Sequence, residues 1–349
     1  MKLTIFLYAY NHEQFIGKAA DAVLNQDYPG ECEIIFSDDC STDRTFEIMR
    51  QKADECRNKR PVILNRNETN LGITGHLNKI IGMGTGDWFV LCAGDDVSLP
   101  NRLSTLVGII EKHPDVMAIN TAMNVIDEHE TPFHYQGFDD MLPFVTGATG
   151  AWNRKLFDFF GPITYPTTAE DVVIPFRAML LGRLAILNAP TINYRMHSGS
   201  VSAPLGLEYQ ASLEHLIKIK GQLTSAVSQR LADLERCRGD LAEADYERLK
   251  KRHLEIRRKL EADCKILQLK RKLLDSTFPQ RLHFLLSEHD IGLTARIKLI
   301  MKTDRLLMRL YRTLKKPSQV HRKYSRDGKL VLVSYHELCT PKYDVMIYL

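Results

Sequence analysis

The first 200 residues alternate short apolar runs with amphipathic stretches, and this alternation constrains the fold more than any other feature of the chain. Strand-like runs occupy residues 3–8, 32–37, 61–65, 87–92 and 116–121, and helical patterns fill 13–26, 42–57, 74–83 and 101–113. Such alternation predicts an α/β fold with right-handed crossovers and a mainly parallel sheet. In a sheet of this kind a ligand binds beyond the carboxyl ends of the strands.

The composition adds a division of charge. The 349 residues are 44% hydrophobic and 26% charged, which excludes wholesale disorder, and the length predicts two or three domains. Residues 1–200 hold 17 Lys and Arg against 25 Asp and Glu, whereas residues 201–349 hold 30 against 18. An acidic half followed by a basic half predicts two modules with different partners.

The cysteines and the N-terminus indicate the compartment. Seven cysteines are scattered without a CxxC pair, which favours a reducing environment over disulfides or a zinc site. No apolar run approaches the ~20 residues that span a bilayer. The N-terminal LTIFLYAY has no cleavage-like site after it and is interpreted as a strand. We therefore expect a soluble cytoplasmic protein, or one held peripherally on the inner face of the membrane.

From residue 205 the pattern is helical. Apolar residues recur every three or four positions from Leu213 to Leu234 and again from Leu249 to Leu273, which predicts a coiled-coil-like hairpin over 205–275. Asp240, followed by Glu243, is typical of the start of its second arm. The near-heptad spacing predicts a homo-oligomer formed through this hairpin. Residues 276–349 then contain a basic helix over 293–316 and two β-like runs, 329–335 and 343–349, expected to form a short hairpin.

Polar clusters directly follow the predicted strands. YAYNH follows the first, SDDCSTDRT includes the end of the second, and GDDVSLP follows the fourth. Adjacent carboxylates repel one another, which is tolerable where they bind a base, a ribose or a cation. The alternative is ordinary helix capping with solvated acids. Asp95 and Asp96 end a strand expected to be central, where two carboxylates suit a divalent cation that bridges phosphate oxygens.

A distal pair of motifs carries further chemistry. Glu170 and Asp171 open a helix, so that a carboxylate with a fixed position can take a proton from a hydroxyl, although helix-dipole stabilisation alone also favours acids there. In YRMHSGSVS, Arg195 can neutralise a diphosphate and His197 can bind a metal or phosphate.

The collinear order of these motifs resembles the family 2 glycosyltransferases with the GT-A fold. The resemblance covers residues 1 to about 203 and includes YNHEQFI, DDCSTDRT, Asn70-Leu71-Gly72, DDVSLPNRL, the Glu-Asp pair and Tyr-Arg-x-His. It implies a GT-A domain over 1–204, ahead of the hairpin and the basic region.

The resemblance also implies roles for particular residues. The nucleotide-sugar set would be Ala9, Asn11, Asp38, Asp39, Asn70, Asp95 and Arg195. Asp96 and His197 would hold a divalent metal, Mn²⁺ or Mg²⁺, and Asp171 would be the general base. Two departures stand out: Ala93 occupies a position where the family often has an acid, so that metal binding depends more on Asp95, Asp96 and His197, and Cys40 replaces a common glycine.

The basic helix over 293–316 admits two interpretations. Its cations gather opposite an apolar face, which suits an anionic membrane surface and equally suits a helix packed on the protein with a solvated basic face.

The sequence thus predicts an inverting, metal-dependent glycosyltransferase. It would move a sugar from a nucleotide diphosphate, with uridine the first candidate nucleoside, to a glycan or lipid-linked acceptor in surface polysaccharide synthesis. The alternative is a non-catalytic nucleotide-sugar-binding scaffold that acts through its hairpin. Nucleic-acid binding ranks last, because the basic half lacks interleaved aromatic residues or a binding motif.

Overall fold

The structure is a computed structural model. It describes residues 1–56, 61–136, 146–165, 169–197, 200, 209–274, 276–277, 280, 283 and 330–333. The chain divides into two compact units. The first contains residues 1–203, 225–256 and 324–349, and the second contains residues 204–224 and 257–323.

A single mixed sheet organises the first unit. Its strands run in the order β10-β9-β6-β8-β4-β1-β2-β3, with β5 paired to β9 and β7 paired to β6. Their bounds are β1 Leu3–Ala9, β2 Cys32–Asp38, β3 Val62–Arg66, β4 Trp88–Ala93, β5 Val97–Ser98, β6 Val116–Ile126, β7 Pro132–Gln136, β8 Ala151–Asn153, β9 Arg183–Arg195 and β10 Leu330–Val333.

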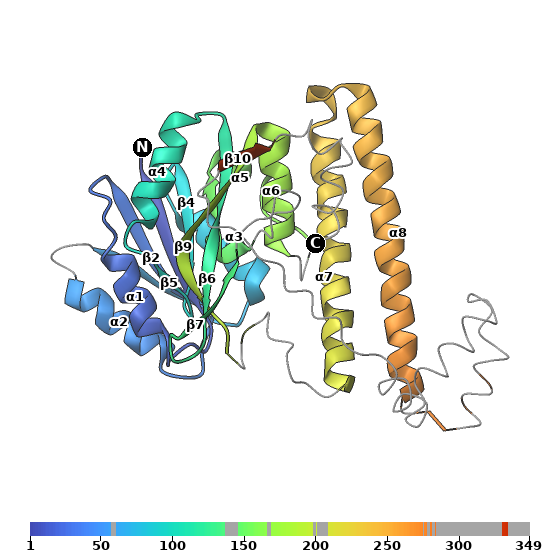
Figure 1. The fold of residues 1–349 in the computed structure, drawn as a ribbon, viewed down its shortest axis with the longest axis horizontal. Helices are drawn as coiled ribbons and strands as arrows, with labels where there is room; N and C mark the ends of the chain where they lie inside the picture. Colours follow the sequence, from blue (N-terminus) through green and yellow to red (C-terminus); the bar gives the residue numbers. More distant parts are fainter. Residues whose placement is uncertain are drawn as a thin grey trace. The chain divides into compact units, whose positions relative to one another are not determined.

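Helices connect the strands (Figure 1). The α-helices are α1 Ile16–Leu24, α2 Thr45–Cys56, α3 Gly72–Met83, α4 Arg102–Lys112, α5 Lys155–Phe160, α6 Glu170–Leu181, α7 Tyr209–Arg236 and α8 Glu243–Leu274; two 3₁₀ turns are η1 Gly147–Thr149 and η2 Arg238–Asp240.

The α/β prediction is confirmed: the half of the sheet from β3 to β4 is parallel throughout, and β6 and β9 also pair in parallel. Strands β1 and β2, β2 and β3, and β1 and β4 all pair in parallel. Beyond β4 the sheet is mixed, because the three-residue strand β8 runs antiparallel to both β4 and β6. Strand β4 is therefore central, as its unbroken apolar sequence predicted, with β1 on one side and β8 on the other.

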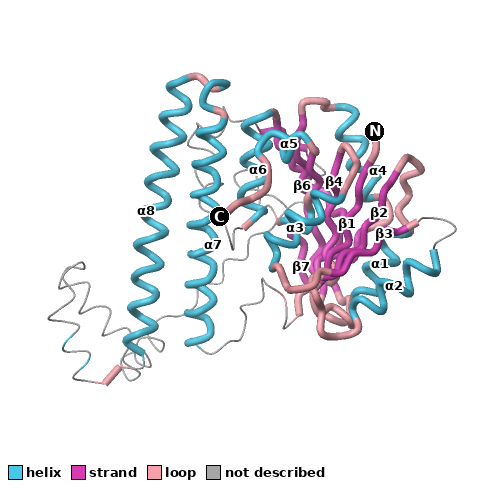
Figure 2. Tube along the Cα trace, turned by 180° about the vertical axis from the view of Figure 1, so that it is seen from behind, coloured by secondary structure: helices cyan, strands magenta, loops and turns pink. Residues whose placement is uncertain are grey.

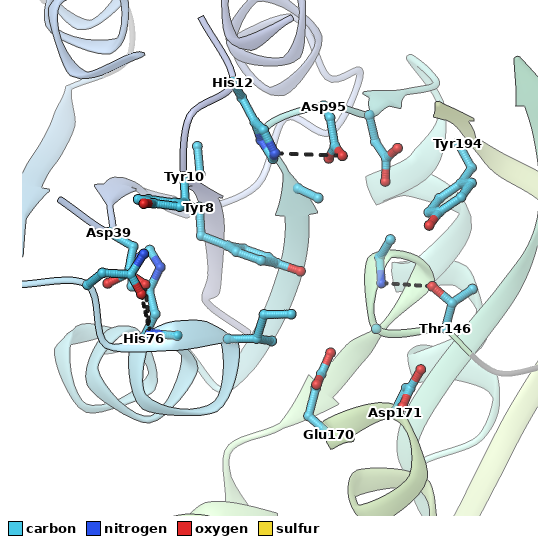
Figure 3. A pocket seen from close by; sticks show the side chains of 18 residues that line it. Tyr8, Tyr10, His12, Asp39, His76, Asp95, Thr146, Glu170, Asp171 and Tyr194 are labelled. Carbon is cyan, nitrogen blue, oxygen red and sulfur yellow. Dashed lines mark hydrogen bonds and ion pairs between the residues drawn. The ribbon is translucent and has the colours of Figure 1, made fainter. Parts of the chain in front are cut away.

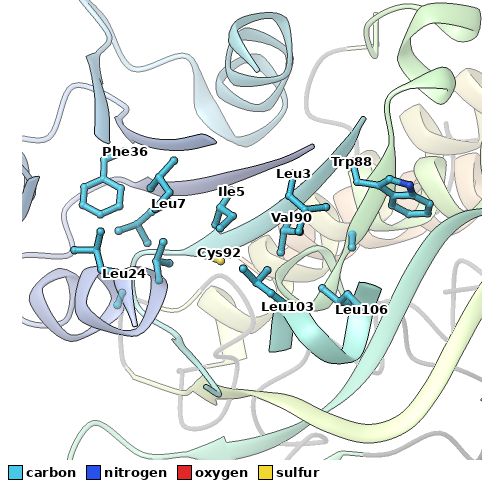
Figure 4. Close-up of a cluster of buried hydrophobic side chains, with 14 of the residues drawn as sticks. Leu3, Ile5, Leu7, Leu24, Phe36, Trp88, Val90, Cys92, Leu103 and Leu106 are labelled. Atoms are coloured by element: carbon cyan, nitrogen blue, oxygen red, sulfur yellow. The ribbon is translucent and has the colours of Figure 1, made fainter. Parts of the chain in front are cut away.

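The main core lies between one face of the sheet and the helices α1, α2 and α4 (Figure 4). Alternate residues of β1 point into it, since side chains along a strand alternate between faces. Burial of each such side chain stabilises the fold by about 2 kcal/mol. The members labelled in the figure are Leu3, Ile5, Leu7, Leu24, Phe36, Trp88, Val90, Cys92, Leu103 and Leu106. This core fixes the strand ends that carry the polar clusters.

Helices α7 and α8 are the two arms of the expected hairpin, and they lie side by side in both views (Figures 1 and 2). The second arm begins at Glu243, because η2 occupies the residues around Asp240. The half of the hairpin nearest its turn, residues 225–256, belongs to the same compact unit as the sheet. Its main tie is a buried ion pair in which Arg177 of α6 donates from Nε to Asp233 of α7 over 2.8 Å.

The C-terminal region meets the sheet through β10, which pairs antiparallel with β9 over Leu330–Val333. This strand comes from the first of the two runs expected to form a C-terminal hairpin. The second run, 343–349, and the basic helix over 293–316 lie outside the described residues. Among the helices that the structure describes, none combines the length and the apolar character needed to cross a membrane.

Candidate active site

A cavity of about 330 Å³ opens at the carboxyl ends of β1 and β4, against the N-terminal ends of α3 and α6 (Figure 3). Six elements far apart in the sequence supply its wall, together with the loops beside them: β1, β4, α3, η1, α6 and β9. The residues that line it are Tyr8, Ala9, Tyr10, His12, Asp39, Asn70, Gly72, Ile73, His76, Ala93, Asp95, Asp96, Thr146, Gly147, Ala148, Glu170, Asp171 and Tyr194.

Most of the predicted site residues meet in this cavity. The six that line it are Ala9, Asp39, Asn70, Asp95, Asp96 and Asp171. Asn11, Asp38, Arg195 and His197 do not line it, although each contacts a loop that does.

Asp39 is fixed by the chain that leads into α3. Its Oδ1 accepts hydrogen bonds from Asn67 Nδ2 and from the main-chain N–H of Leu71, over 2.8 and 2.9 Å, and its Oδ2 accepts one from the N–H of Gly72 over 3.0 Å. Asn70 Oδ1 accepts from the same Gly72 N–H. Gly72 has φ +69°, a conformation that side chains disfavour. The aspartate thus ties β2 to α3 and presents its remaining lone pairs to the cavity.

Asn11 and Asp38 hold the neighbouring loops together. Asn11 adopts φ 55°, and its Oδ1 accepts from the main-chain N–H of Thr42 over 2.9 Å. Asp38 is completely buried; its Oδ2 accepts from the N–H of Ser41 over 3.0 Å and lies 3.3 Å from Arg66 Nε. In this structure both side chains position the cavity rim rather than face the cavity.

The acid pair after β4 has two differently placed carboxylates. Asp95 Oδ2 lies 3.3 Å from His197 Nε2 and 3.8 Å from His12 Nε2. Burial opposes ionisation of Asp95, but the hydrogen bond with His197, the charge of His12 and a main-chain hydrogen bond together outweigh it and lower the pKa. Asp96 Oδ1 accepts from the main-chain N–H of Arg195, whereas its buried Oδ2 has no hydrogen-bond partner among the residues that the structure describes. Burial and the adjacent charge of Asp95 raise the pKa of Asp96 well above its ordinary value.

These two carboxylates fit a hard divalent cation. A buried carboxylate oxygen without a partner is unfavourable unless something else binds it, and Mg²⁺ and Mn²⁺ both take carboxylate oxygens. Within the part of the chain that the structure describes, no three His, Cys, Asp or Glu side chains converge as a ready-made metal site. A cation would therefore need ligands beyond the protein, and diphosphate oxygens are of the right kind.

The Arg195 side chain turns away from the cavity. Its Nε donates to the main-chain oxygen of Asp95 over 2.9 Å, and its Nη2 pairs with Glu130 over 3.0 Å. The guanidinium also lies 4.9 Å from the centre of the Phe15 ring, and the residue is 2% exposed. Arg195 thus fixes the Asp95–Asp96 loop through these contacts, and its expected contact with a diphosphate stays a prediction.

On the opposite side of the cavity Glu170 and Asp171 stand side by side at the start of α6 (Figure 3). Burial, followed by the charge of Asp171, raises the pKa of Glu170 to about 8. Burial raises the pKa of Asp171 to about 6. Two carboxyls whose pKa values are driven apart can serve as an ionised base and a protonated neighbour at the same pH. At neutral pH the ionised member is Asp171.

The sequence interpretation assigned no role to several wall residues. Tyr8 points its ring across the cavity in Figure 3, and burial, followed by the charge of Glu170, raises its pKa well above the ordinary value. His12 lies beside Asp95, and His76 makes a 2.6 Å hydrogen bond with Ser37. Tyr8 and His12 belong to the YAYNH cluster at the end of β1, and Tyr194 begins the Tyr-Arg-x-His motif, so these positions were the available signal. Thr146 carried no comparable signal.

Comparison with known proteins supports this interpretation. The family model described as "Glycosyl transferase family 2" matches residues 4–181. "Putative glycosyltransferase EpsE" of Bacillus subtilis is 34% identical over 127 residues, which are 36% of this chain and 45% of that protein. "Poly(ribitol-phosphate) beta-N-acetylglucosaminyltransferase TarS" of Staphylococcus aureus is 31% identical over 122 residues, 34% of this chain and 21% of TarS. The matches thus span less than half of these relatives.

A solved structure extends the likeness of fold. The crystal structure of S. aureus TarS 1–349 in complex with UDP-GlcNAc has a TM-score of 0.52 and 19% identity, and the match covers 95% of this chain and 96% of that one. The same TarS region in complex with UDP gives a TM-score of 0.51 at 16% identity. At such identity the likeness establishes the GT-A fold alone.

Proposed function

Because this chain belongs to glycosyl transferase family 2, we propose that it is an inverting enzyme that uses a nucleotide-diphosphate sugar, with a UDP-sugar as the first donor to test. The observation that carries the proposal is the cavity itself, whose wall contains both acid pairs, Asp95–Asp96 and Glu170–Asp171, with Asp95 on the side opposite Glu170 and Asp171 (Figure 3). One pair suits the diphosphate end of a donor and the other suits proton removal from an acceptor. The UDP and UDP-GlcNAc complexes of TarS motivate the choice of uridine.

The roles follow from the positions of the side chains. Ala9, Asp39 and Asn70 line the end of the cavity at β1 and α3, where the nucleoside would lie. Asn11 and Asp38 support that end from behind through their bonds to Thr42 and Ser41. Arg195 would hold the Asp95–Asp96 loop through its main chain and its guanidinium.

Asp171 is the base in this scheme. Its pKa of about 6 leaves it mostly ionised at neutral pH, so it can accept the proton of an acceptor hydroxyl. The hydroxyl oxygen then attacks the anomeric carbon from the face opposite the diphosphate, the glycosidic bond forms as the bond to the diphosphate breaks, and the configuration inverts. Glu170, with a pKa of about 8, stays protonated and can donate a hydrogen bond.

Asp95 and Asp96 would hold a divalent cation, Mn²⁺ or Mg²⁺, together with the donor. When bound, such an ion neutralises the charge that develops on the leaving diphosphate. His197 contacts Asp95 and would orient that carboxylate, or bind the ion itself.

The acceptor proposed is a glycan or lipid-linked hydroxyl in surface polysaccharide synthesis. The similarity to TarS, a poly(ribitol-phosphate) beta-N-acetylglucosaminyltransferase, supports this class. The proposed location is the cytoplasm, with the basic segment 293–316 as an attachment to anionic lipid at the inner face of the membrane.

A donor screen tests the proposal. Purified protein is incubated with UDP- and GDP-sugars, in the presence and absence of Mn²⁺ or Mg²⁺, and release of nucleoside diphosphate is measured. We expect release from at least one donor, abolished by a chelator and by Asp96→Asn. Donor binding without turnover over a panel of glycan and lipid-linked acceptors would instead favour the scaffold.

A further inference from the structure

The first turn of α6, which carries the proposed base, contacts the hairpin. Arg230 of α7 is 4% exposed, and its Nε donates to the main-chain oxygen of Val172 over 2.8 Å, with a second bond from Nη2 to the same oxygen. Its guanidinium lies 5.2 Å from the centre of the Phe176 ring. Val172 directly follows Asp171 in the first turn of α6. The buried Arg230 therefore fixes the first turn of α6, which carries the proposed base Asp171.

Two residues near Arg230 on the same face of α7, Gln229 and Asp233, add further contacts. Asp233 accepts from Arg177 Nε and Nη2 over 2.8 and 3.0 Å, a bidentate pair on α6. Gln229 donates to Asp233 over 3.0 Å, and its Oε1 accepts from the main-chain N–H of Thr164 over 2.9 Å. All three side chains on α7 are buried. Residues three and four apart share a helix face. One turn of α7 therefore holds α6 through Arg230 and Asp233, and Gln229 holds the segment before α6 at Thr164.

The charge of Arg230 acts on the base. Burial lowers the pKa of Arg230 to about 9 against the opposing effects of Asp171 and Asp233, so the residue remains a cation at neutral pH. That cation favours the ionised form of Asp171. Among the residues that the structure describes, the other charged or titratable groups of this site include Glu170 and Arg177 on α6, Asp233 on α7, and Arg252 and His253 on α8. Burial lowers the pKa of His253 to about 3, so that it is neutral beside Arg230.

We propose that Arg230 is a positioning residue for the Asp171 base: it clamps the first turn of α6 and supplies the positive charge behind the carboxylate. The half of the hairpin nearest its turn is then part of the active site. The proposal rests on the proposed function only in that Asp171 is the catalytic base. The contact of Arg230 with α6 and the effect of its charge on Asp171 do not depend on that function.

The test uses the full chain with three substitutions. Arg230→Gln removes the charge but keeps a hydrogen-bond donor, Arg230→Lys keeps the charge with a poorer donor, and Arg236→Gln is the matched control. Arg236 lies on the same helix, over the Phe159 ring, and is exposed. The pKa of Asp171 is read by ¹³C NMR of side-chain-labelled aspartate, with Asp171→Asn assigning the signal. The acid limb of the transfer rate is read in parallel.

Arg230→Gln should raise the pKa of Asp171, and the acid limb with it, by about 1 unit, because a close opposite charge is lost. Arg230→Lys should leave the pKa within about 0.3 unit yet slow transfer roughly tenfold through misplacement of the base. Arg236→Gln should change neither. If Arg230→Gln shows no cooperative thermal unfolding, and so does not fold, the transfer rate and the Asp171 pKa of Arg230→Lys decide the test.

An unmoved pKa in a folded Arg230→Gln variant overturns the proposal, as does an Arg230→Lys variant that matches the wild type in rate. If the NMR shift appears but no donor is turned over by the wild type, the charge on Asp171 stands and the enzymatic function fails.

Discussion

The main-chain N–H of Arg195 donates to Asp96 Oδ1 over 2.9 Å. This bond joins the end of β9 to the loop after β4, and β5 strengthens the same junction by pairing Val97 and Ser98 with Asn193 and Ile192. One oxygen of Asp96 thereby accepts a hydrogen bond within the fold, while the other has no hydrogen-bond partner in the described part of the chain. The carboxylate is held rigidly with a free oxygen, which is the arrangement that a ligand site requires.

We expect Asp96→Asn to abolish tight Mn²⁺ binding in the presence of a nucleoside diphosphate. The amide can still accept the bond from Arg195, but it removes the charge that attracts the cation. Electron paramagnetic resonance of free Mn²⁺ measures the loss. Undiminished binding by the variant would assign the cation to other ligands.

Asp171→Asn should lower the rate of transfer on the order of 10²–10⁴-fold while the donor affinity stays unchanged, since a missing general base costs that much. Calorimetry of donor binding beside a transfer assay separates the two quantities. Asp158→Asn, at an exposed position on α5, is the matched control. A variant that transfers at the wild-type rate would move the role of base to Glu170.

Glu170 should make the stability of the protein depend on pH. Its pKa is raised from 4.5 to about 8 on folding, so its favourable contribution is complete below pH 4.5 and is lost as the pH rises through 8. Glu170→Gln should therefore be more stable than the wild type at pH 9, by up to about 5 kcal/mol for a pKa shift of this size, and equal to it near pH 4. Urea unfolding at several pH values measures this.

The exposed Glu255 of α8 provides the control for that experiment, because Glu255→Gln removes the same charge far from the cavity. If the free energies of unfolding of Glu170→Gln and the wild type differ by the same amount at every pH from 4 to 9, the prediction is contradicted.

Gly147→Ala should disturb the acid pair on α6, because a Cβ at this position would lie 2.6 Å from Glu170 Oε1. We expect a fall in the transfer rate of roughly tenfold with a folded protein, since misplacement near the reacting groups is costly. Gly108→Ala, where a Cβ meets nothing within 4 Å inside α4, should raise stability by about 0.5–1 kcal/mol. Equal activity of the two variants would show that Glu170 can move freely.

The hairpin should mediate self-association through the half that lies outside the sheet unit. Leu216 and Ile266, in the second compact unit, are 45% and 38% exposed, which is unusual for large apolar side chains on paired helices. Leu216→Glu with Ile266→Glu should convert a dimer into a monomer in light scattering, without a change in donor binding. An identical mass for both proteins would remove this surface from consideration.

Local pattern predicted much of the fold. The strands from β1 to β4 and the helices between them follow from periodicity, because each is bounded by its own turn residues and buries its own apolar face. Strand β8, which lies between β4 and β6 in the sheet, was missed, because a strand of three residues is too short to show a hydrophobic period.

The sequence predicted which residues lie at the site better than it predicted where their side chains point. Asp95, Asp96 and Asp171 were found because carboxylates follow strands or open a helix, and they meet in the cavity. The direction of the Arg195 side chain was not accessible, because it depends on Glu130 and on the carbonyl of Asp95, which only the folded sheet brings near. The contribution of Arg230 was missed for the same reason, since a cation on an amphipathic helix gives no sign of what it will pack against.

Strand β10 has a consequence for biosynthesis. Its partner β9 ends at Arg195, whereas β10 begins at Leu330, so the ribosome must complete most of the chain before this pairing can form. During that interval the nascent chain presents β9 with unpaired main-chain groups, the kind of edge to which foreign strands add. Late closure by a segment so distant in the sequence makes translation speed and chaperone capture relevant to the yield of folded protein.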